Sequence, residues 1–169
     1  METLQAIHTR RSIRKYTDEP VSGELIREIL AAAMSAPSAG NAQTWQFVVV
    51  TERNLLDKVK DINPYSAMAG NAPLAILVCG DLSREKYEGF WVQDCSAATQ
   101  NLLLAAHDKG LGAVWTGIYP MMDRIAGFRK MFNLPETVIP LGLVVVGHPA
   151  QESVAKDRFR AENIHYNKW

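Results

Sequence analysis

The spacing of apolar residues along this chain switches repeatedly between the helical and the extended pattern. Where apolar side chains recur every three or four residues, a helix that buries one face is indicated. Helices are expected near residues 4–7, between Ser22 and Pro37, near residues 55–59, and over residues 91–107 and 120–132. Short continuous or β-branched apolar runs between turn residues indicate strands. Strands are expected at residues 47–50, 74–79, 113–118 and 139–146.

Two segments are more apolar than is usual for a segment exposed to water. Residues 91–107 are apolar on most of the helix circumference. Such a helix must be buried on more than one side, so we expect it at the centre of the fold or at a subunit interface as well. The last residues, 163–169, contain Ile164, Tyr166 and Trp169. We expect this C-terminal segment to dock on another surface, such as that of a partner subunit.

Composition limits the classes of function. With 169 residues the chain is expected to form one domain over residues 1–169. Its 18 basic and 18 acidic residues cancel, which removes the broad attraction behind non-specific nucleic-acid binding. No apolar run approaches the ~20 residues that cross a bilayer, and no signal peptide is evident. A cytoplasmic protein without a membrane or nucleic-acid partner is expected, with Cys79 and Cys95 as buried, reduced thiols and no metal site.

Positive charge is concentrated at two places far apart in the sequence. The first group comprises Arg10, Arg11, Ser12, Arg14 and Lys15, and the second comprises Lys156, Arg158 and Arg160. Because the chain has no net charge, this concentration suggests one anion site that folding assembles from both groups. A phosphate is the obvious ligand, since guanidinium groups match its oxygens bidentately and a serine hydroxyl donates a further hydrogen bond. The alternative is that each group is simply a solvated, charged surface.

Two pliable stretches could approach a flat ligand. Residues 37–45 lie between a helix and a strand, where Ser38, Asn41 and Gln43 offer donors and acceptors for the polar edge of a heterocycle. The alternative reading of this stretch is a loop of turn-forming residues. Gly110 is most simply the C-cap of the long helix. Gly117 stands inside an extended run, where a glycine often marks close approach by a ligand or another backbone.

Four segments in this order resemble the FMN-dependent nitroreductase family, and the resemblance covers nearly the whole chain. They are residues 10–16, residues 36–45, residues 106–117 with their Gly-Leu-Gly, and the strand ending at Gly147 followed by residues 156–158. The resemblance implies an α+β fold of three layers, in which helices surround a central mixed, mainly antiparallel sheet. It also implies a homodimer with two flavin sites between the subunits.

The resemblance also implies roles for individual residues. The flavin phosphate would be held by Arg10, Ser12, Arg14, Lys156 and Arg158, which is the anion site already inferred from charge. Pro37, Ser38 and Asn41 would reach the flavin from the partner subunit, and the backbone of Thr116 and Gly117 would lie near its reactive N5. Arg11, from the first basic group, and Gln43, with its amide donor and acceptor, are further cofactor-binding candidates. Thr44 stands where the family often has proline, and Thr116 stands where longer members often have glutamate.

No arrangement of acid, base or nucleophile stands out in the sequence. His8, His107, His148 and His165 are scattered and are expected to be surface or packing residues. This absence suits a flavoenzyme, in which the cofactor carries the hydride chemistry. We therefore expect an oxidoreductase that uses FMN, with NADH or NADPH as donor, to reduce nitroaromatic, quinone or similar acceptors by a ping-pong mechanism. A non-catalytic module that binds or stores flavin and a small adaptor without flavin are the alternatives.

Overall fold

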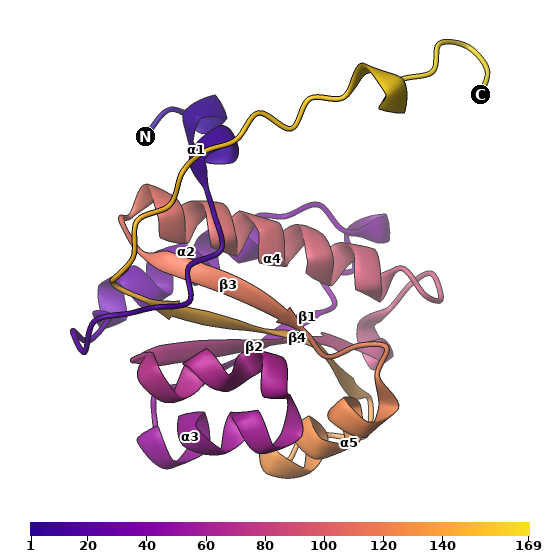
Figure 1. Cartoon of the computed structure of the whole chain (residues 1–169). Coiled ribbons are helices and arrows are strands. Elements are labelled where there is room, and N and C mark those ends of the chain that lie inside the picture. Colours follow the sequence, from indigo (N-terminus) through magenta and orange to yellow (C-terminus); the bar gives the residue numbers. More distant parts are fainter.

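The computed structural model describes residues 1–169, and a four-stranded sheet in the order β1-β2-β4-β3 forms its centre (Figure 1). The strands are β1 (Trp45–Val50), β2 (Leu74–Asp81), β3 (Gly112–Gly117) and β4 (Val138–Gly147). All neighbouring strands of the sheet pair antiparallel. Parallel pairing is confined to a single bridge between Ser12 and Ala113 beside β3. The expected strands are all present, with their ends moved by one or two residues.

Helices cover both faces of this sheet. On one side lie α1 (Thr3–Thr9), α2 (Gly23–Met34) and α4 (Trp91–Asp108). On the other lie α3 (Arg53–Ile62), the 3₁₀ segment η2 (Pro64–Asn71) and α5 (Met122–Met131). Short 3₁₀ turns η1 (Ala39–Asn41), η3 (Leu82–Arg84) and η4 (Ala161–Asn163) complete the chain. This arrangement confirms the three-layer α+β fold with a mainly antiparallel sheet.

The central strands are buried on both faces, which explains their continuous apolar sequence. Along β2, Leu74, Ile76 and Val78 pack toward α2 and α4. The alternate residues of β2, from Ala75 to Cys79, pack toward α3 and α5. The sheet therefore separates two apolar cores, as the period of two in a strand requires.

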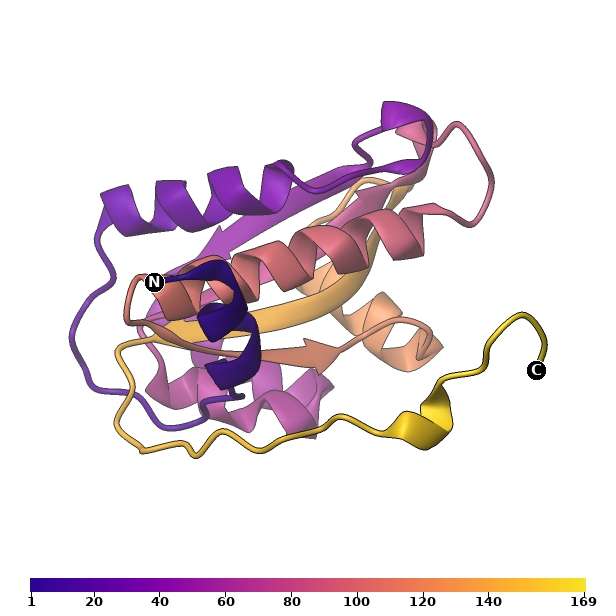
Figure 2. The ribbon, with the colours of Figure 1, turned by 90° about the horizontal axis from the view of Figure 1, so that it is seen from above.

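Helix α4 meets the prediction that it is buried on more than one side. The residues of its sheet-facing stripe, including Cys95, Ala98, Leu102 and Ala106, are fully buried. A neighbouring stripe packs against α2, which lies beside α4 on the same face of the sheet (Figure 2). No helix of the protein has the length and apolar character that crossing a membrane requires.

The C-terminal segment leaves the body of the protein after β4. It passes beside α1 and β3 and then extends away from the other elements, as both views show (Figures 1 and 2). Every residue from 152 to 169 is exposed. Tyr166 is 82% exposed and Trp169 is fully exposed. Within one chain, this apolar tail therefore has no surface of its own to dock on.

Candidate cofactor site

The two basic groups of the sequence meet beside the first residues of β3. Arg11 joins them, because its Nε and Nη2 atoms donate to Val154 O (3.3 Å) and Lys156 O (3.2 Å). The side-chain oxygen of Gln151 accepts hydrogen bonds from the backbone N–H groups of Arg14 (2.9 Å) and Lys15 (3.0 Å). The charges separated by some 140 positions in the sequence are thus held side by side, as the anion-site prediction requires.

The charges of this basic cluster have no acidic partners. None of Arg10, Arg11, Arg14, Lys156 and Arg158 forms an ion pair. Burial, followed by the neighbouring charges of Arg11 and Arg158, lowers the pKa of Arg10. Like charges gathered without a counterion repel one another, and an anion removes that repulsion. The cluster therefore fits a phosphate group.

Arg11 differs from its neighbours in how its guanidinium is used. Besides the bonds to the C-terminal segment, its Nη1 donates to His8 O (2.9 Å) and Arg10 O (2.6 Å). A guanidinium has five N–H donors, so Arg11 retains one for a ligand. Arg11 therefore acts first as a brace between the two basic groups, and its contact with a cofactor stays a prediction.

The outer edge of β3 continues from this cluster as an open strip of backbone. Ile13 N donates to Ala113 O (3.0 Å), so Ala113 points its backbone groups outward, whereas Ile118 N donates inward to Leu141 O (3.1 Å). Backbone groups alternate in direction along a strand, so the N–H of Gly117 also points outward. The carbonyl of Gly117 already accepts from Asn63 Nδ2 (3.2 Å) and Arg124 Nη1 (3.1 Å).

Space at Gly117 suits the approach of a flat ligand. A Cβ atom built on Gly117 would meet no atom within 4 Å, whereas one on Gly112 would lie 2.6 Å from the Ile13 side chain. The packing of this chain thus explains the glycine at 112 but not the one at 117. Next to Gly117 is an open hollow of about 390 Å³. It is lined by Val92, Ser96, Trp115, Gly117, Tyr119, Pro120 and Leu141.

Thr116 turns its side chain away from this hollow. It is buried, its hydroxyl donates to Leu143 O (3.0 Å), and it contacts Ser66 Oγ at 2.7 Å. Because backbone groups alternate along β3, those of Thr116 point inward to β4, so the outward N–H at this end of the strand is that of Gly117. A threonine here leaves the backbone strip intact, although longer proteins of the resembling family often have glutamate.

The loop over residues 37–45 shapes itself with its own polar groups. Ser38 Oγ accepts from Gln43 N (3.0 Å), and Gln43 Nε2 donates to Asn41 Oδ1 (2.9 Å). Gly40, Asn41 and Gln43 have positive φ angles of 58°, 53° and 49°. Asn41 and Gln43 are nevertheless exposed, so the loop presents polar groups at its surface. The turn-forming interpretation thus explains its conformation, and a role toward a ligand stays a prediction.

Asp94 anchors this loop to the first turn of α4. Its Oδ1 accepts from Ala39 N (2.9 Å), while its buried Oδ2 has no partner in the chain. By contrast, Thr9, which precedes Arg10, contacts His107 near the other end of α4. The 13 steps from Asp94 to His107 span about 20 Å of helix. One chain therefore brings together the basic cluster and the β3 edge, but it holds the 37–45 loop apart from that cluster.

Sequence reasoning missed Gln151, Asp94 and the contact between Thr9 and His107. Gln151 belongs to no motif, and its role depends on the backbone that folds beside it. Asp94 gave a usable signal, because its carboxylate stands between Val92 and Cys95 in a helix that is apolar on most of its circumference. Cys79 and Cys95 are buried and unpaired as expected, and burial raises the pKa of each thiol to about 12.

Comparison with known proteins agrees with this geometry. The model of the nitroreductase family matches residues 7–148. A protein of Methanothermobacter thermautotrophicus, provisionally named NADH dehydrogenase/NAD(P)H nitroreductase, is 54% identical over 169 residues, which cover 100% of this chain and 88% of that protein. The chain therefore belongs to the nitroreductase family.

Two crystal structures show how far the fold is shared. The structure of a protein from Parabacteroides distasonis with the same provisional name matches with a TM-score of 0.95 and 44% identity, and the match covers 99% of this chain and 98% of that one. A provisionally named nitroreductase from Desulfovibrio desulfuricans, solved in complex with FMN, matches with a TM-score of 0.86 and 35% identity over 100% of this chain and 98% of that one.

Proposed function

We propose that this protein is an FMN-dependent oxidoreductase that takes hydride from NADH or NADPH and passes it to nitroaromatic, quinone or similar acceptors. The observation that carries the proposal is the continuity of the unpaired basic cluster with the open edge of β3, which ends at the unfilled space beside Gly117. The family, the FMN-bound relative from Desulfovibrio desulfuricans and the NAD(P)H named for the relative from Methanothermobacter support it.

Each part of the site has a task suited to its chemistry. Arg10, Ser12, Arg14, Lys156 and Arg158 would hold the phosphate through charge-assisted hydrogen bonds. The ribityl chain would follow the edge of β3, where the four steps from Ala113 to Gly117 span about 13 Å. The outward N–H of Gly117 would donate to the polar edge of the flavin ring. The hollow between Trp115, Tyr119 and Val92 offers an apolar wall beside that position.

The chain supplies binding and orientation, and FMN, when bound, supplies hydride transfer. Both cysteine thiols are buried and stay protonated at neutral pH, since each has a pKa of about 12. The residues that line the hollow include no Cys, His, Asp, Glu or Lys. With one open face, the nicotinamide and the acceptor would occupy the same place in turn. This alternation predicts parallel double-reciprocal plots, and intersecting plots would show that both substrates bind together.

A homodimer would complete the site. The exposed C-terminal segment would dock on the partner subunit, and Pro37, Ser38, Asn41 and Gln43 would face the partner's flavin. The buried Oδ2 of Asp94 beside this loop has no hydrogen-bond partner within the chain. Since buried polar atoms normally have one, this supports a donor supplied by the partner subunit. The distance of the loop from the basic cluster of its own chain supports action in trans.

The test begins with the visible spectrum of the purified protein and chromatography of the cofactor that heat releases. We expect FMN rather than FAD, because the cluster suits a terminal phosphate. Anaerobic addition of NADH or NADPH should bleach the flavin, and an acceptor should restore its colour. Bound FMN that neither nicotinamide reduces would favour a flavin-storage module, while failure to bind any flavin would overturn the phosphate site.

A matched pair of variants tests the phosphate contact itself. Arg158→Ala should weaken FMN binding by about 1.5 to 3 kcal/mol, the range for hydrogen bonds to charged groups. Arg160 is the control, because its guanidinium is already paired with Glu162 at 3.5 Å. Arg160→Ala should leave the affinity nearly unchanged. Fluorescence titration with FMN measures both, and equal losses would remove Arg158 from the site.

A further inference from the structure

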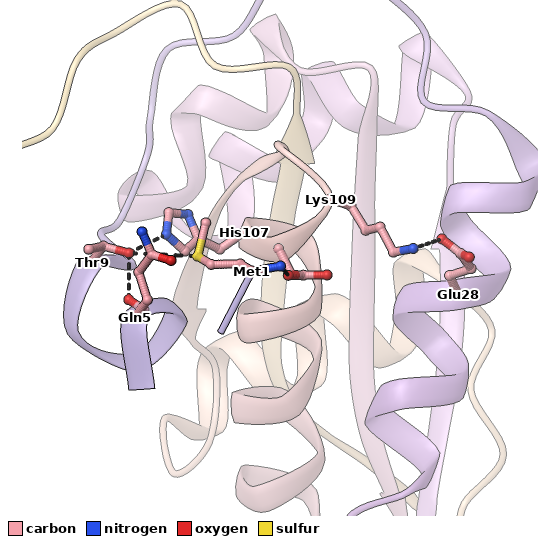
Figure 3. Close-up of polar contacts among 7 residues, drawn as sticks. Met1, Gln5, Thr9, Glu28, His107 and Lys109 are labelled. Carbon is pink, nitrogen blue, oxygen red and sulfur yellow. Dashed lines mark hydrogen bonds and ion pairs between the residues drawn. The ribbon is translucent and has the colours of Figure 1, made fainter. Parts of the chain in front are cut away.

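His107 connects the end of α4 to the end of α1 (Figure 3). Its Nε2 lies 2.8 Å from Thr9 Oγ1, and that hydroxyl donates its proton to Gln5 O at 2.7 Å. A hydroxyl has one proton, so Nε2 must carry the hydrogen of the bond between His107 and Thr9. The hydrogen-bond network therefore assigns Nδ1 as the ring atom that can gain a proton while the contact with Thr9 remains.

This contact lies directly before the basic cluster. Thr9 is the last residue of α1, and Arg10 is its C-cap, with its N–H donating to Ala6 O. A ring that holds Thr9 thus fixes the point from which Arg10 leaves the helix. The Arg10 guanidinium in turn lies close enough to Arg11 and Arg158 for their charges to lower its pKa.

The charged groups around His107 come from the segment after α1 and from α4 itself. Burial, Arg10 and Arg11 lower the pKa of His107, while Asp108 raises it. Asp108 is 2.6 Å from the amino group of Met1. Lys109, next along the chain, is paired with Glu28 of α2 at 2.8 Å. The unpaired charges that act on the imidazole are therefore those of the two arginines.

We propose that His107 is a positioning residue of the phosphate site, which holds Arg10 through Thr9 and gains a proton when a phosphate group binds beside Arg10. This inference rests on the proposed function, since the phosphate is that of FMN. A bound dianion cancels the repulsion that Arg10 and Arg11 exert on a charged imidazole. The carbonyl groups at the C-terminal end of α4 also favour a cation there.

Proton uptake on binding sets the direction of the pH dependence. In the free protein the pKa of His107 is below its ordinary value, so the ring is mainly neutral at neutral pH. If the complex holds the proton more tightly, FMN affinity rises as the pH falls through the range where only the complex is protonated. Below about pH 6 the phosphate takes up its own second proton and loses charge. The informative range lies above that value.

The experiment measures the dissociation constant of FMN by flavin fluorescence at about pH 6.5 and about pH 8.5, both above the second pKa of the phosphate. Three proteins are compared: wild type, His107→Gln and His107→Ala. Glutamine retains an N–H that can reach Thr9 but cannot carry charge. His8→Gln is the control, because that exposed side chain on α1 makes no hydrogen bond.

Wild type and His8→Gln should bind FMN more tightly at the lower pH, by up to about tenfold if the complex binds the proton ten times more tightly. His107→Gln should match wild type at the higher pH and gain much less at the lower one. His107→Ala should bind more weakly at both. Riboflavin, which lacks the phosphate, should show no dependence on residue 107. Calorimetry of FMN binding in two buffers of different ionisation enthalpy should detect proton uptake by the wild-type protein but not by His107→Gln.

Identical pH profiles for wild type and His107→Gln would overturn the inference while leaving the proposed function intact. The same pH dependence with riboflavin would overturn it as well, because the effect would not come from the phosphate. Failure of the wild-type protein to bind FMN would instead overturn the proposed function. If His107→Ala does not fold, the comparison with His107→Gln still decides.

Discussion

The two glycines of β3 serve different purposes, one for packing within the fold and the other for the approach of the ligand. Gly112 and Gly117 stand at the two ends of one strand, yet only Gly112 is packed closely, against Ile13. Gly112→Ala should lower the free energy of unfolding by about 1 to 3 kcal/mol, the cost of overpacking. Gly117→Ala should change it by less than about 1 kcal/mol, because an added Cβ meets open space.

For FMN binding, Gly117→Ala should be the more damaging of the two variants. Gly117→Ala should weaken it by about 1 to 3 kcal/mol, since the new methyl group occupies the space proposed for the ring. Urea denaturation of the apoprotein and fluorescence titration with FMN measure the two effects separately. Unchanged FMN affinity in Gly117→Ala would place the ring elsewhere.

For single residues, the sequence predicted the meeting of distant charges better than it predicted individual hydrogen bonds. The convergence of Arg10 and Arg158 followed from their unexplained concentration in a chain without net charge, and folding brings them together. The roles of Gln151 and His107 could not be predicted, because each depends on which backbone or hydroxyl group a distant element places beside it. A lone glutamine or histidine carries no such information.

Helices and strands were predictable wherever burial gave them a clear period. The continuous apolar run of β2 and the amphipathic pattern of α2 each produced the expected element. The order of the strands and the parallel bridge at Ser12 could not be derived, because they depend on long-range pairing. The positive φ angles of Asn41 and Gln43 were also missed, since neither residue is a glycine.

The start of α2 offers a test of one such local signal. Ser22 Oγ accepts a hydrogen bond from Leu25 N at 3.2 Å, as an N-cap should. Ser22→Ala should lower the free energy of unfolding by about 1 kcal/mol. Ser153→Ala, in the exposed C-terminal segment, is the control and should have almost no effect. Equal urea midpoints for the two variants would show that the cap contributes nothing.

The whole molecule should be a dimer, because the apolar tail is exposed and the buried Oδ2 of Asp94 beside the 37–45 loop has no partner within one chain. Light scattering should give roughly twice the chain mass of 18.8 kDa. Coexpression of an Arg158→Ala chain with an Asn41→Gly chain then tests whether the site is shared. Glycine keeps the positive φ of residue 41 without strain and removes only the side chain.

If Asn41 acts in trans, the heterodimer contains one site with both residues intact and one with neither. FMN titration should then show half of the sites with wild-type affinity. If Asn41 acts in cis, every site has one defect, and no site should bind as wild type does. Each homodimeric variant serves as the reference for its own defect.

The outer edge of β3 also matters before the protein meets its cofactor. Beyond the bridge at Ser12 no strand lies beside it, and Trp115 adds exposed aromatic surface there. An unpaired edge of this kind invites another chain to add a strand and is a usual starting point for aggregation. A ligand lying along it would shield the edge as a covering loop does in other proteins. The supply of flavin during overproduction would then govern how much of the protein remains in solution, because FMN and a second protein chain would compete for the same backbone groups of β3.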